Sequence, residues 1–307
     1  MIKLIYRVCG VIGLSLAISV PAQTVAVSPS STTTILVTPN GPGGLSGNLC
    51  VALQPTLSQI LGQNVVIEYR PGANGLLGAQ HVASVKTGKP VLMLGSVIAD
   101  LPMDQTNDIV PILIIGHAPL FIVARSDLGV KTLAELINKS PKSSISYGVP
   151  SGSTGGVYMK GLINDVKSKI ELVEIPYKSG GAALADLLGG HINIAVVAGS
   201  VVGQHIENGS LVSLGVLSTN RSRMDPTTPT MHEQGIRFEN DIAGFNTQAI
   251  WGSPNIKSDT VKLIRREYSA WAKTPEGQEF YRKNDMQFNP QYISNPDAVI
   301  KQLVKRQ

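Results

Sequence analysis

Four short loops, rich in glycine and small hydroxyl residues, are the part of this sequence best suited to hold a ligand. They span 39–47 (PNGPGGLSG), 72–75 (GANG), 151–156 (SGSTGG) and 179–181 (SGG). Each follows a predicted strand and precedes a predicted helix, so backbone N–H groups and helix dipoles can meet an anion there. A carboxylate fits this chemistry because it accepts several hydrogen bonds at once. In any single loop the glycines could simply form a tight turn, but four matching loops favour a shared binding cleft.

Groups that would support catalysis or metal binding are few. The five histidines are scattered without metal-ligand spacing, and the sequence has neither a G-x-S-x-G nucleophile motif nor a phosphate-binding P-loop motif. Cys50 lies at helical spacing among leucines, which favours a buried core residue over a catalytic thiol. We therefore expect a protein that is not an enzyme and that holds no metal and no cofactor.

The first 22 residues have the pattern of a cleavable secretory signal peptide. Lys3 and Arg7 precede an apolar run over 8–20, and small residues around Ala22 suit cleavage before Gln23. A single membrane span is the alternative, but the run is about 13 residues long and a bilayer needs roughly 20. We expect export to the periplasm.

Charge and composition narrow the classes of partner. Of the 307 residues, 43% are hydrophobic and 15% are charged, which is typical of a globular protein with a sizeable core. Without Lys3 and Arg7 the 26 basic residues become 24 against 21 acidic ones, so the formal charge falls from +5 to +3. Because the basic residues form no long run, we expect no nucleic-acid partner.

Apolar periodicity predicts an α/β fold with two similar units, in which strands and helices alternate over 35–94 and again over 144–217. This pattern predicts two doubly wound α/β domains, each a parallel sheet covered on both faces, with the glycine-rich loops at the carboxyl ends of the strands. The apolar segments 111–125 and 243–251 are predicted to cross between the domains. The expected domains are 23–120 plus 241–307 (domain I) and 121–240 (domain II).

One local conflict concerns Pro55, which falls inside the predicted helix that follows the first loop. A proline in a helix interior costs about 3 kcal/mol or forces a kink, because its ring clashes and its N–H is missing. If Ser46 caps this helix, we expect the helix to be bent or interrupted near Pro55.

Several segments of the sequence resemble a known protein family. Among them are LGQNVVIEYRPGANGLLGAQHVA (61–83), IPYKSGGAALADLLGGHIN (175–193) and PTMHEQG (229–235). From Ile35 onward the sequence is similar to the substrate-binding proteins of tripartite tricarboxylate transporters, the Bug family of exported proteins. The resemblance implies a type II periplasmic-binding-protein fold, in which two α/β domains joined by crossing strands close over a ligand like a Venus flytrap.

The resemblance also implies a function and a set of site residues. It implies a monomeric receptor that captures a small organic acid in the periplasm and delivers it to the membrane permease subunits of the transporter. The alternative output is signalling through a sensor kinase. In relatives, the first loop and the glycine–serine loop of the second domain hold one carboxylate, partly through water. The residues that match these positions are Thr38, Pro39, Asn40, Gly43, Gly44, Leu45, Ser46, Ser151, Ser153 and Thr154, with Asn74 and Ser96 as further candidates.

The sequence departs from the family pattern at several site positions. Asn40 replaces an aromatic residue, and Gly47 replaces an acid. A second acid is missing near Val197, the histidine expected at 156–158 is absent, and one pocket wall is shortened at 96–108. Loss of both acids removes the groups best able to pair with a ligand ammonium. We therefore expect a carboxylate with an uncharged body, a dicarboxylate or an aromatic acid, rather than an amino acid.

Overall fold

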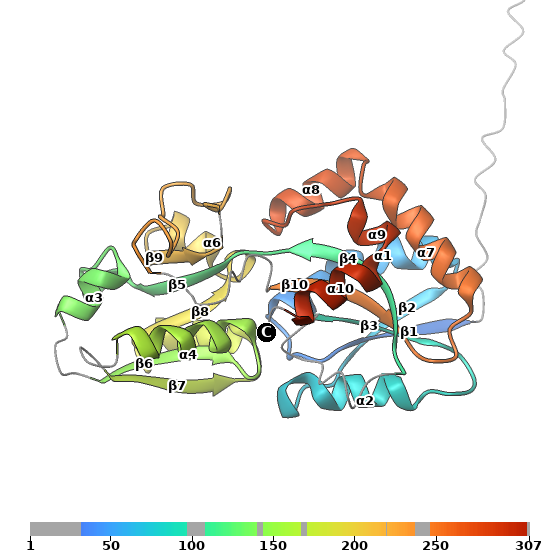
Figure 1. Cartoon of the computed structure of the whole chain (residues 1–307), viewed down its shortest axis with the longest axis horizontal. Helices are drawn as coiled ribbons and strands as arrows, with labels where there is room; N and C mark the ends of the chain where they lie inside the picture. Colours follow the sequence, from blue (N-terminus) through green and yellow to red (C-terminus); the bar gives the residue numbers. More distant parts are fainter. Residues whose placement is uncertain are drawn as a thin grey trace, which may run out of the picture.

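The computed structural model describes residues 32–96, 108–139, 144–166, 171–218, 220–236 and 246–305. The predicted signal peptide and the first part of the predicted return crossing lie outside these residues. Within them the chain forms two lobes, each with one five-stranded sheet flanked by helices (Figure 1). No helix in this part of the chain combines the length and apolar character that a bilayer span needs.

The first lobe comes from two separate parts of the chain, up to residue 117 and from residue 246 onward. Its strands are β1 (Thr33–Thr38), β2 (Asn64–Tyr69), β3 (Val91–Ser96), β4 (Val110–His117) and β10 (Thr247–Gly252). Their order in the sheet is β2-β1-β3-β10-β4. Its helices are α1 (Leu45–Leu61), the 3-10 turn η1 (Ala73–Gly75), α2 (Leu76–Ser84), α7 (Ser258–Trp271), α8 (Pro275–Lys283), α9 (Gln291–Ser294) and α10 (Pro296–Lys305).

The second lobe lies between these two parts in the sequence. Its strands are β5 (Leu120–Arg125), β6 (Ser144–Pro150), β7 (Glu171–Tyr177), β8 (Ile194–Ala198) and β9 (Leu211–Leu217). Their order in the sheet is β7-β6-β8-β5-β9. Its helices are the 3-10 turn η2 (Ser126–Leu128), α3 (Leu133–Lys139), α4 (Thr154–Val166), α5 (Gly180–Leu188) and α6 (Gly199–Glu207).

Both sheets are mixed, which corrects the expectation of purely parallel sheets. β1 pairs in parallel with β2 and β3, and β6 pairs in parallel with β7 and β8. The fourth strand of each sheet, β10 or β5, runs antiparallel to both of its neighbours. Each of these strands arrives from the other lobe and enters its sheet at the edge where the parallel strands end, so it must run the opposite way. Apolar periodicity carries no information on that direction.

Buried apolar residues hold the lobes together. Every residue of β3 and β8 is buried, as expected for central strands covered on both faces. Helix α1 packs against β2 and β3 with its buried leucines Leu49, Leu53 and Leu57. Helix α7 packs on α1 and so adds the C-terminal part of the chain to the first lobe.

Helix α1 is continuous from Leu45 to Leu61, so the predicted interruption at Pro55 does not occur. Pro55 cannot donate to the carbonyl of Val51, but the Val51 side chain is 56% exposed, so this turn of the helix faces water and its carbonyl can be hydrated. The cap also differs from the prediction. Gly44, with extended backbone, precedes the helix, and Ser46 lies in its first turn.

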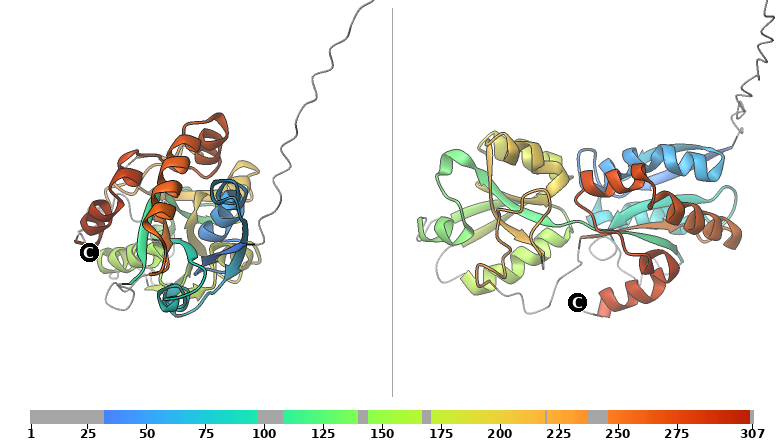
Figure 2. Two further views of the ribbon diagram at one scale, coloured as in Figure 1. Left: turned by 90° about the vertical axis from the view of Figure 1, so that its right-hand side faces the viewer. Right: turned by 90° about the horizontal axis from the view of Figure 1, so that it is seen from above.

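The two lobes are joined directly from β4 to β5. Two residues, Ala118 and Pro119, separate these strands, so the segment 111–125 crosses between the sheets as predicted. The predicted domain boundary at 120/121 falls at the first residue of β5, and the one at 240/241 lies outside the described residues. Viewed from above, the lobes lie side by side with this connection between them (Figure 2).

Candidate functional site

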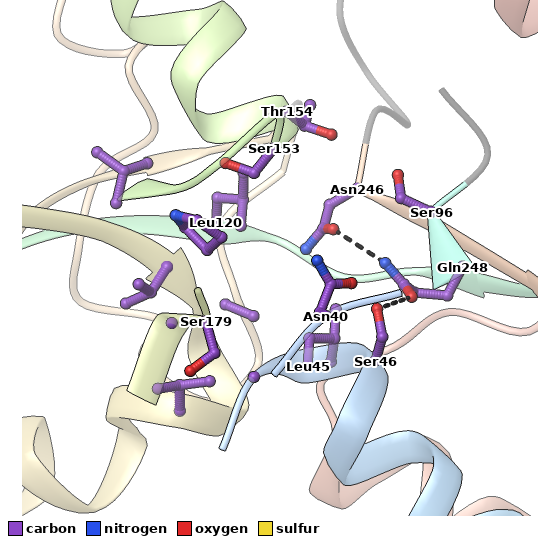
Figure 3. A pocket seen from close by; sticks show the side chains of 17 residues that line it. Asn40, Leu45, Ser46, Ser96, Leu120, Ser153, Thr154, Ser179, Asn246 and Gln248 are labelled. Atoms are coloured by element: carbon purple, nitrogen blue, oxygen red, sulfur yellow. Dashed lines mark hydrogen bonds between the residues drawn. The ribbon is translucent and has the colours of Figure 1, made fainter. Parts of the chain in front are cut away.

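A small cavity lies where the two lobes meet (Figure 3). Its volume is about 60 Å³. A single buried water needs roughly 10–15 Å³, so the cavity has room for a compact molecule. The first lobe contributes Asn40, Gly44, Leu45, Ser46, Ser96, Asn246 and Gln248 to its lining. The second lobe contributes Leu120, Pro150, Ser153, Thr154, Ser179, Gly180, Val196, Val197, Ala198 and Val201.

Four helices begin at this cavity. Lining residues Gly44, Ser179 and Ala198 are the N-caps of α1, α5 and α6, and α4 begins at the lining residue Thr154. Each helix N-terminus carries roughly half a positive charge from its aligned peptide dipoles. No lining residue in the described part of the chain has an ionisable side chain. The cavity is therefore electropositive through its backbone, without a lysine or arginine.

A buried chain of hydrogen bonds forms the first-lobe wall. The Ser46 hydroxyl donates to Gln248 Oε1 at 2.8 Å, and Gln248 Nε2 donates to Asn246 Oδ1 at 3.3 Å. Ser46 and Gln248 are 4% and 2% exposed, so water does not compete for the bond between them. Ser46 is predicted from the sequence to contact the ligand, whereas Asn246 and Gln248 are not. In the structure the Ser46 hydroxyl is instead the start of this relay.

Three polar atoms at the cavity are buried without a hydrogen-bond partner among the described residues. They are Ser96 Oγ and Asn246 Nδ2 on the first lobe and Ser153 Oγ on the second. Buried polar groups in native proteins are nearly always satisfied by protein, water or ligand. All three groups can donate a hydrogen bond, so the arrangement is prepared for an acceptor.

Most of the sequence matches the model of one protein family. The model describes the tripartite tricarboxylate transporter family receptor, and it matches residues 50–306. The chain belongs to this family. The resemblance found in the sequence is thereby confirmed. Receptors of this family are periplasmic solute-binding proteins rather than enzymes, which confirms the expectation of a non-enzymatic binding protein.

Individual relatives agree with the family assignment. The chain is 30% identical to protein BugT of Bordetella pertussis over 75% of this chain and 74% of BugT. Its fold is similar to that of Rpa4515 of R. palustris solved with adipate, with a TM-score of 0.77, 22% identity and coverage of 90% and 95% of the two chains. MatC of Rhodopseudomonas palustris with bound malate gives a TM-score of 0.75, 17% identity and coverage of 90% and 98%. These likenesses confirm the predicted two-lobed α/β fold.

The receptor brings together residues from three of the four loops predicted to bind. Seven of the predicted site residues line the cavity, namely Asn40, Gly44, Leu45, Ser46, Ser96, Ser153 and Thr154. Thr38 and Pro39 lie behind them. Thr38 is fully buried, and the Pro39 ring packs where a side chain on Gly95 would otherwise stand. Ser151 donates its backbone N–H to the carbonyl of Tyr177. Asn74 belongs to η1, and its side chain lies outside the described residues.

Gly43 has a different position from the one predicted for a ligand contact. Its φ of +77° is a conformation that favours glycine, and it packs against Gly181 of the second lobe. Beside it, the Gly41 N–H donates to the carbonyl of Lys178 at 3.0 Å, which joins the two lobes through their backbones. The glycines of the first loop therefore serve contact between the lobes as well as access to the cavity.

Cys50 is a core residue of the receptor, as predicted. Its side chain is fully buried, and burial raises the pKa of its thiol to about 12. A thiol with this pKa is neutral at physiological pH and unreactive. Among the described residues, no group of three His, Cys, Asp or Glu side chains is arranged to hold a metal ion.

Proposed function

We propose that this receptor captures a small organic carboxylate in the cavity between its lobes and delivers it to the membrane permease of a tripartite tricarboxylate transporter. The observation that carries the proposal is the convergence of four helix N-termini on a cavity whose described lining holds no ionisable side chain. Such a site favours an anion through dipoles and hydrogen bonds. The related folds were solved with adipate and malate, both carboxylates, which supports this class of ligand.

The uncharged lining also separates candidate ligands. An amino acid would bring an ammonium group, and neither wall offers an acid among the described residues to pair with it. Val197, near the position where relatives have an acid, lies in this lining. The proposed ligand is therefore a dicarboxylate or an aromatic acid.

The proposed mechanism is closure of two domains on the ligand. We take 23–120 plus 241–307 and 121–240 as the moving domains, with β4 and β5 as part of the hinge. A ligand that contacts both lobes binds the closed state more tightly than the open one and shifts the population toward it. The bond from Gly41 to Lys178 joins the two lobes in this structure, and in the proposed mechanism it breaks when the lobes open. The proposed working form is a monomer in the periplasm after removal of residues 1–22.

Calorimetry on the exported, purified protein tests the ligand class. We expect dicarboxylates or aromatic acids such as succinate, adipate and benzoate to bind more tightly than aspartate and glutamate. Native mass spectrometry of the protein as purified should show a retained acid. Tighter binding of aspartate or glutamate than of every dicarboxylate and aromatic acid tested would contradict the proposal.

A separate experiment tests the output. The ligand-loaded receptor should co-purify with permease subunits, and cells that lack the receptor should lose uptake of the same acid. Recovery of a sensor kinase, with uptake unchanged, would favour signalling and contradict delivery to a permease.

A further inference from the structure

The sequence contains three Asn-Gly pairs, and one of them lies at the cavity. Asn40 belongs to the first-lobe lining, where Figure 3 shows its side chain, and Gly41 follows it directly. Both residues lie between β1 and α1, outside regular secondary structure. The backbone nitrogen of the next residue can attack an asparagine side chain, and glycine hinders this attack least because it has no side chain. The pair at the cavity is therefore open to a spontaneous chemical change.

The change is an intramolecular deamidation that needs only water. The Gly41 backbone nitrogen gives up its proton and forms a bond to Asn40 Cγ, while the bond from Cγ to Nδ2 breaks and ammonia leaves with that proton. The product is a five-membered succinimide ring. Water then opens the ring at either carbonyl and leaves aspartate or isoaspartate at this position. In sum, an amide and water become a carboxylate and an ammonium ion, without oxidation or reduction.

A hydrogen bond between the lobes holds the nitrogen that would attack. The Gly41 N–H donates to the carbonyl of Lys178 in the second lobe at 3.0 Å. A backbone N–H that is hydrogen-bonded in the native state gives up its proton mainly when that part of the structure opens. Separation of the lobes breaks this bond and frees the nitrogen. The reaction at Asn40 is therefore coupled to opening of the receptor.

The pair Asn208–Gly209 has no such link to the other lobe and serves as an internal comparison. The Gly209 N–H donates to the carbonyl of Ile206 at 3.1 Å, within the second lobe. The Asn208 side chain is also held locally, because its Oδ1 accepts from the backbone N–H and the hydroxyl of Ser210. Opening of the lobes leaves these bonds in place.

We propose that Asn40 is a self-modification site that deamidates in the open, ligand-free receptor and is protected when the receptor closes on its ligand. This proposal rests on the closing motion of the proposed function. The product carries a negative charge in a lining that otherwise holds no ionisable side chain among the described residues. Repulsion between this charge and a carboxylate a few ångströms away should weaken binding at least about 100-fold. A receptor that stays empty therefore loses its affinity with time, whereas a loaded receptor keeps it.

A disulfide that closes the lobes without any ligand tests the protection. A Cβ placed on Gly44 would lie 3.3 Å from the Cβ of Ser179 in the second lobe, close to the separation of about 3.5–4.5 Å that a disulfide spans. The double variant Gly44→Cys with Ser179→Cys is compared with itself in the oxidised and the reduced state. Each state is incubated at mildly alkaline pH in heavy-oxygen water. Peptide mass spectrometry then measures the label taken up at Asn40 and at Asn208.

The reduced protein should take up label at Asn40 at least about tenfold faster than the oxidised protein, because the Gly41 nitrogen is freed only by opening. Uptake at Asn208 should be equal in both states. Equal uptake at Asn40 in both states, or none in the reduced protein, would overturn the proposal. Asn40→Gln should take up no label at this position on the same timescale, because its longer side chain would have to form a less favourable six-membered ring.

A ligand should protect the wild-type protein in the same way. The probe is whichever of succinate, adipate and benzoate binds most tightly, and a saturating amount should slow labelling of Asn40 at least about tenfold. Unchanged labelling with this acid bound would contradict the proposal. If none of the three acids binds, the proposed function fails, while the oxidised and reduced proteins still decide whether deamidation depends on closure.

Two further variants test the consequence for binding. Asn40→Asp reproduces one product of the reaction, and calorimetry should show at least about 100-fold weaker binding of the same acid. Asn208→Asp, the same chemical change at the C-cap of α6, is the matched control and should bind normally. Thermal unfolding of both variants confirms that a lost affinity reflects the cavity and not the fold. Wild-type affinity in Asn40→Asp would overturn the loss of function on deamidation.

Discussion

Replacement of Gly181 with alanine tests whether contact between the lobes controls affinity. Gly181 is the second residue of α5, and a Cβ placed on it would lie 2.8 Å from the carbonyl oxygen of Gly43 in the first lobe. Both groups belong to the backbone, so neither can turn aside. Within the second lobe the same change favours α5, because alanine is up to about 1 kcal/mol better than glycine in a helix.

The clash with Gly43 should weaken ligand binding, whereas the higher helix propensity of alanine should stabilise the ligand-free protein, and separate measurements detect these two effects. Closure would require one backbone to shift by several tenths of an ångström, and overpacking of this kind costs about 1–3 kcal/mol. Since 1.4 kcal/mol is about tenfold in Kd, Gly181→Ala should weaken ligand binding about 5- to 150-fold. The ligand-free protein can keep its lobes apart, so its unfolding temperature should equal or exceed that of the wild type.

Calorimetry with the tightest ligand and thermal unfolding without ligand measure the two effects. Gly156→Ala in α4 is the matched control, because a Cβ there would meet its nearest atom, Val149 Cγ2, at an ordinary 3.7 Å. Wild-type affinity in Gly181→Ala would refute closure through this contact. Equal losses in both variants would show that the helices, and not the meeting of Gly43 with Gly181, are responsible. Gly43 itself is a poorer position to test, because any side chain there is strained at its φ of +77°.

Three further predictions follow from single side chains. Ser153→Asp adds a negative charge at the start of α4, where Asp is well tolerated; repulsion worth about 4 kcal/mol at 4 Å should abolish carboxylate binding in calorimetry. Ser258→Asp, at the start of α7, should bind normally. Cys50, whose thiol pKa is raised to about 12, should resist alkylation at pH 8 until the protein is unfolded, and rapid labelling of the native protein would contradict its burial. Asp285 accepts a hydrogen bond from Ser222 of the other lobe, and burial raises the pKa of its carboxyl group. Above this raised pKa the buried carboxylate is charged and lowers the free energy of unfolding. This loss of stability disappears as the pH falls toward 3.8, where the carboxyl group is protonated in the folded protein. Asp285→Asn, which also suits the φ of +49° there, should raise the unfolding temperature at pH 7 more than at pH 4, and a lower temperature at pH 7 would contradict this.

Much of the fold could be predicted from the sequence because strands, helices and turns depend on the apolar pattern and the glycines of short segments. Strands such as β3 and helices such as α7 have clear apolar patterns, and glycines after β1 and β6 mark the turns that lead into α1 and α4. The direction of β5 and β10 could not be read, because it depends on which lobe each strand comes from. The uninterrupted course of α1 through Pro55 depends on which face of the helix meets water, and this is a tertiary property.

The lining residues on the glycine-rich loops and Ser96 at the end of β3 were predicted, whereas Asn246 and Gln248, beside and within β10, were missed. Loop residues such as Asn40 and Ser153 stand out by composition, whereas Asn246 and Gln248 enter the site only because β10 lies beside β3. The available signal was weak: two amide side chains, one just before β10 and one near its start. Their partner Ser46 lies 202 residues earlier in the chain, so spacing could not connect them.

The position of β10 between β3 and β4 has a consequence for the order of folding. In the first sheet β4 has β10 as its single neighbour, so β4 stays unpaired until nearly the whole polypeptide has been synthesised. All strands of the second sheet are contiguous in the sequence and become available earlier. Pairing between distant segments is slow, so the N-terminal half completes its sheet last. β1, β2 and β3 pair with one another without β10, so the delay falls on β4 and on the completion of the first sheet.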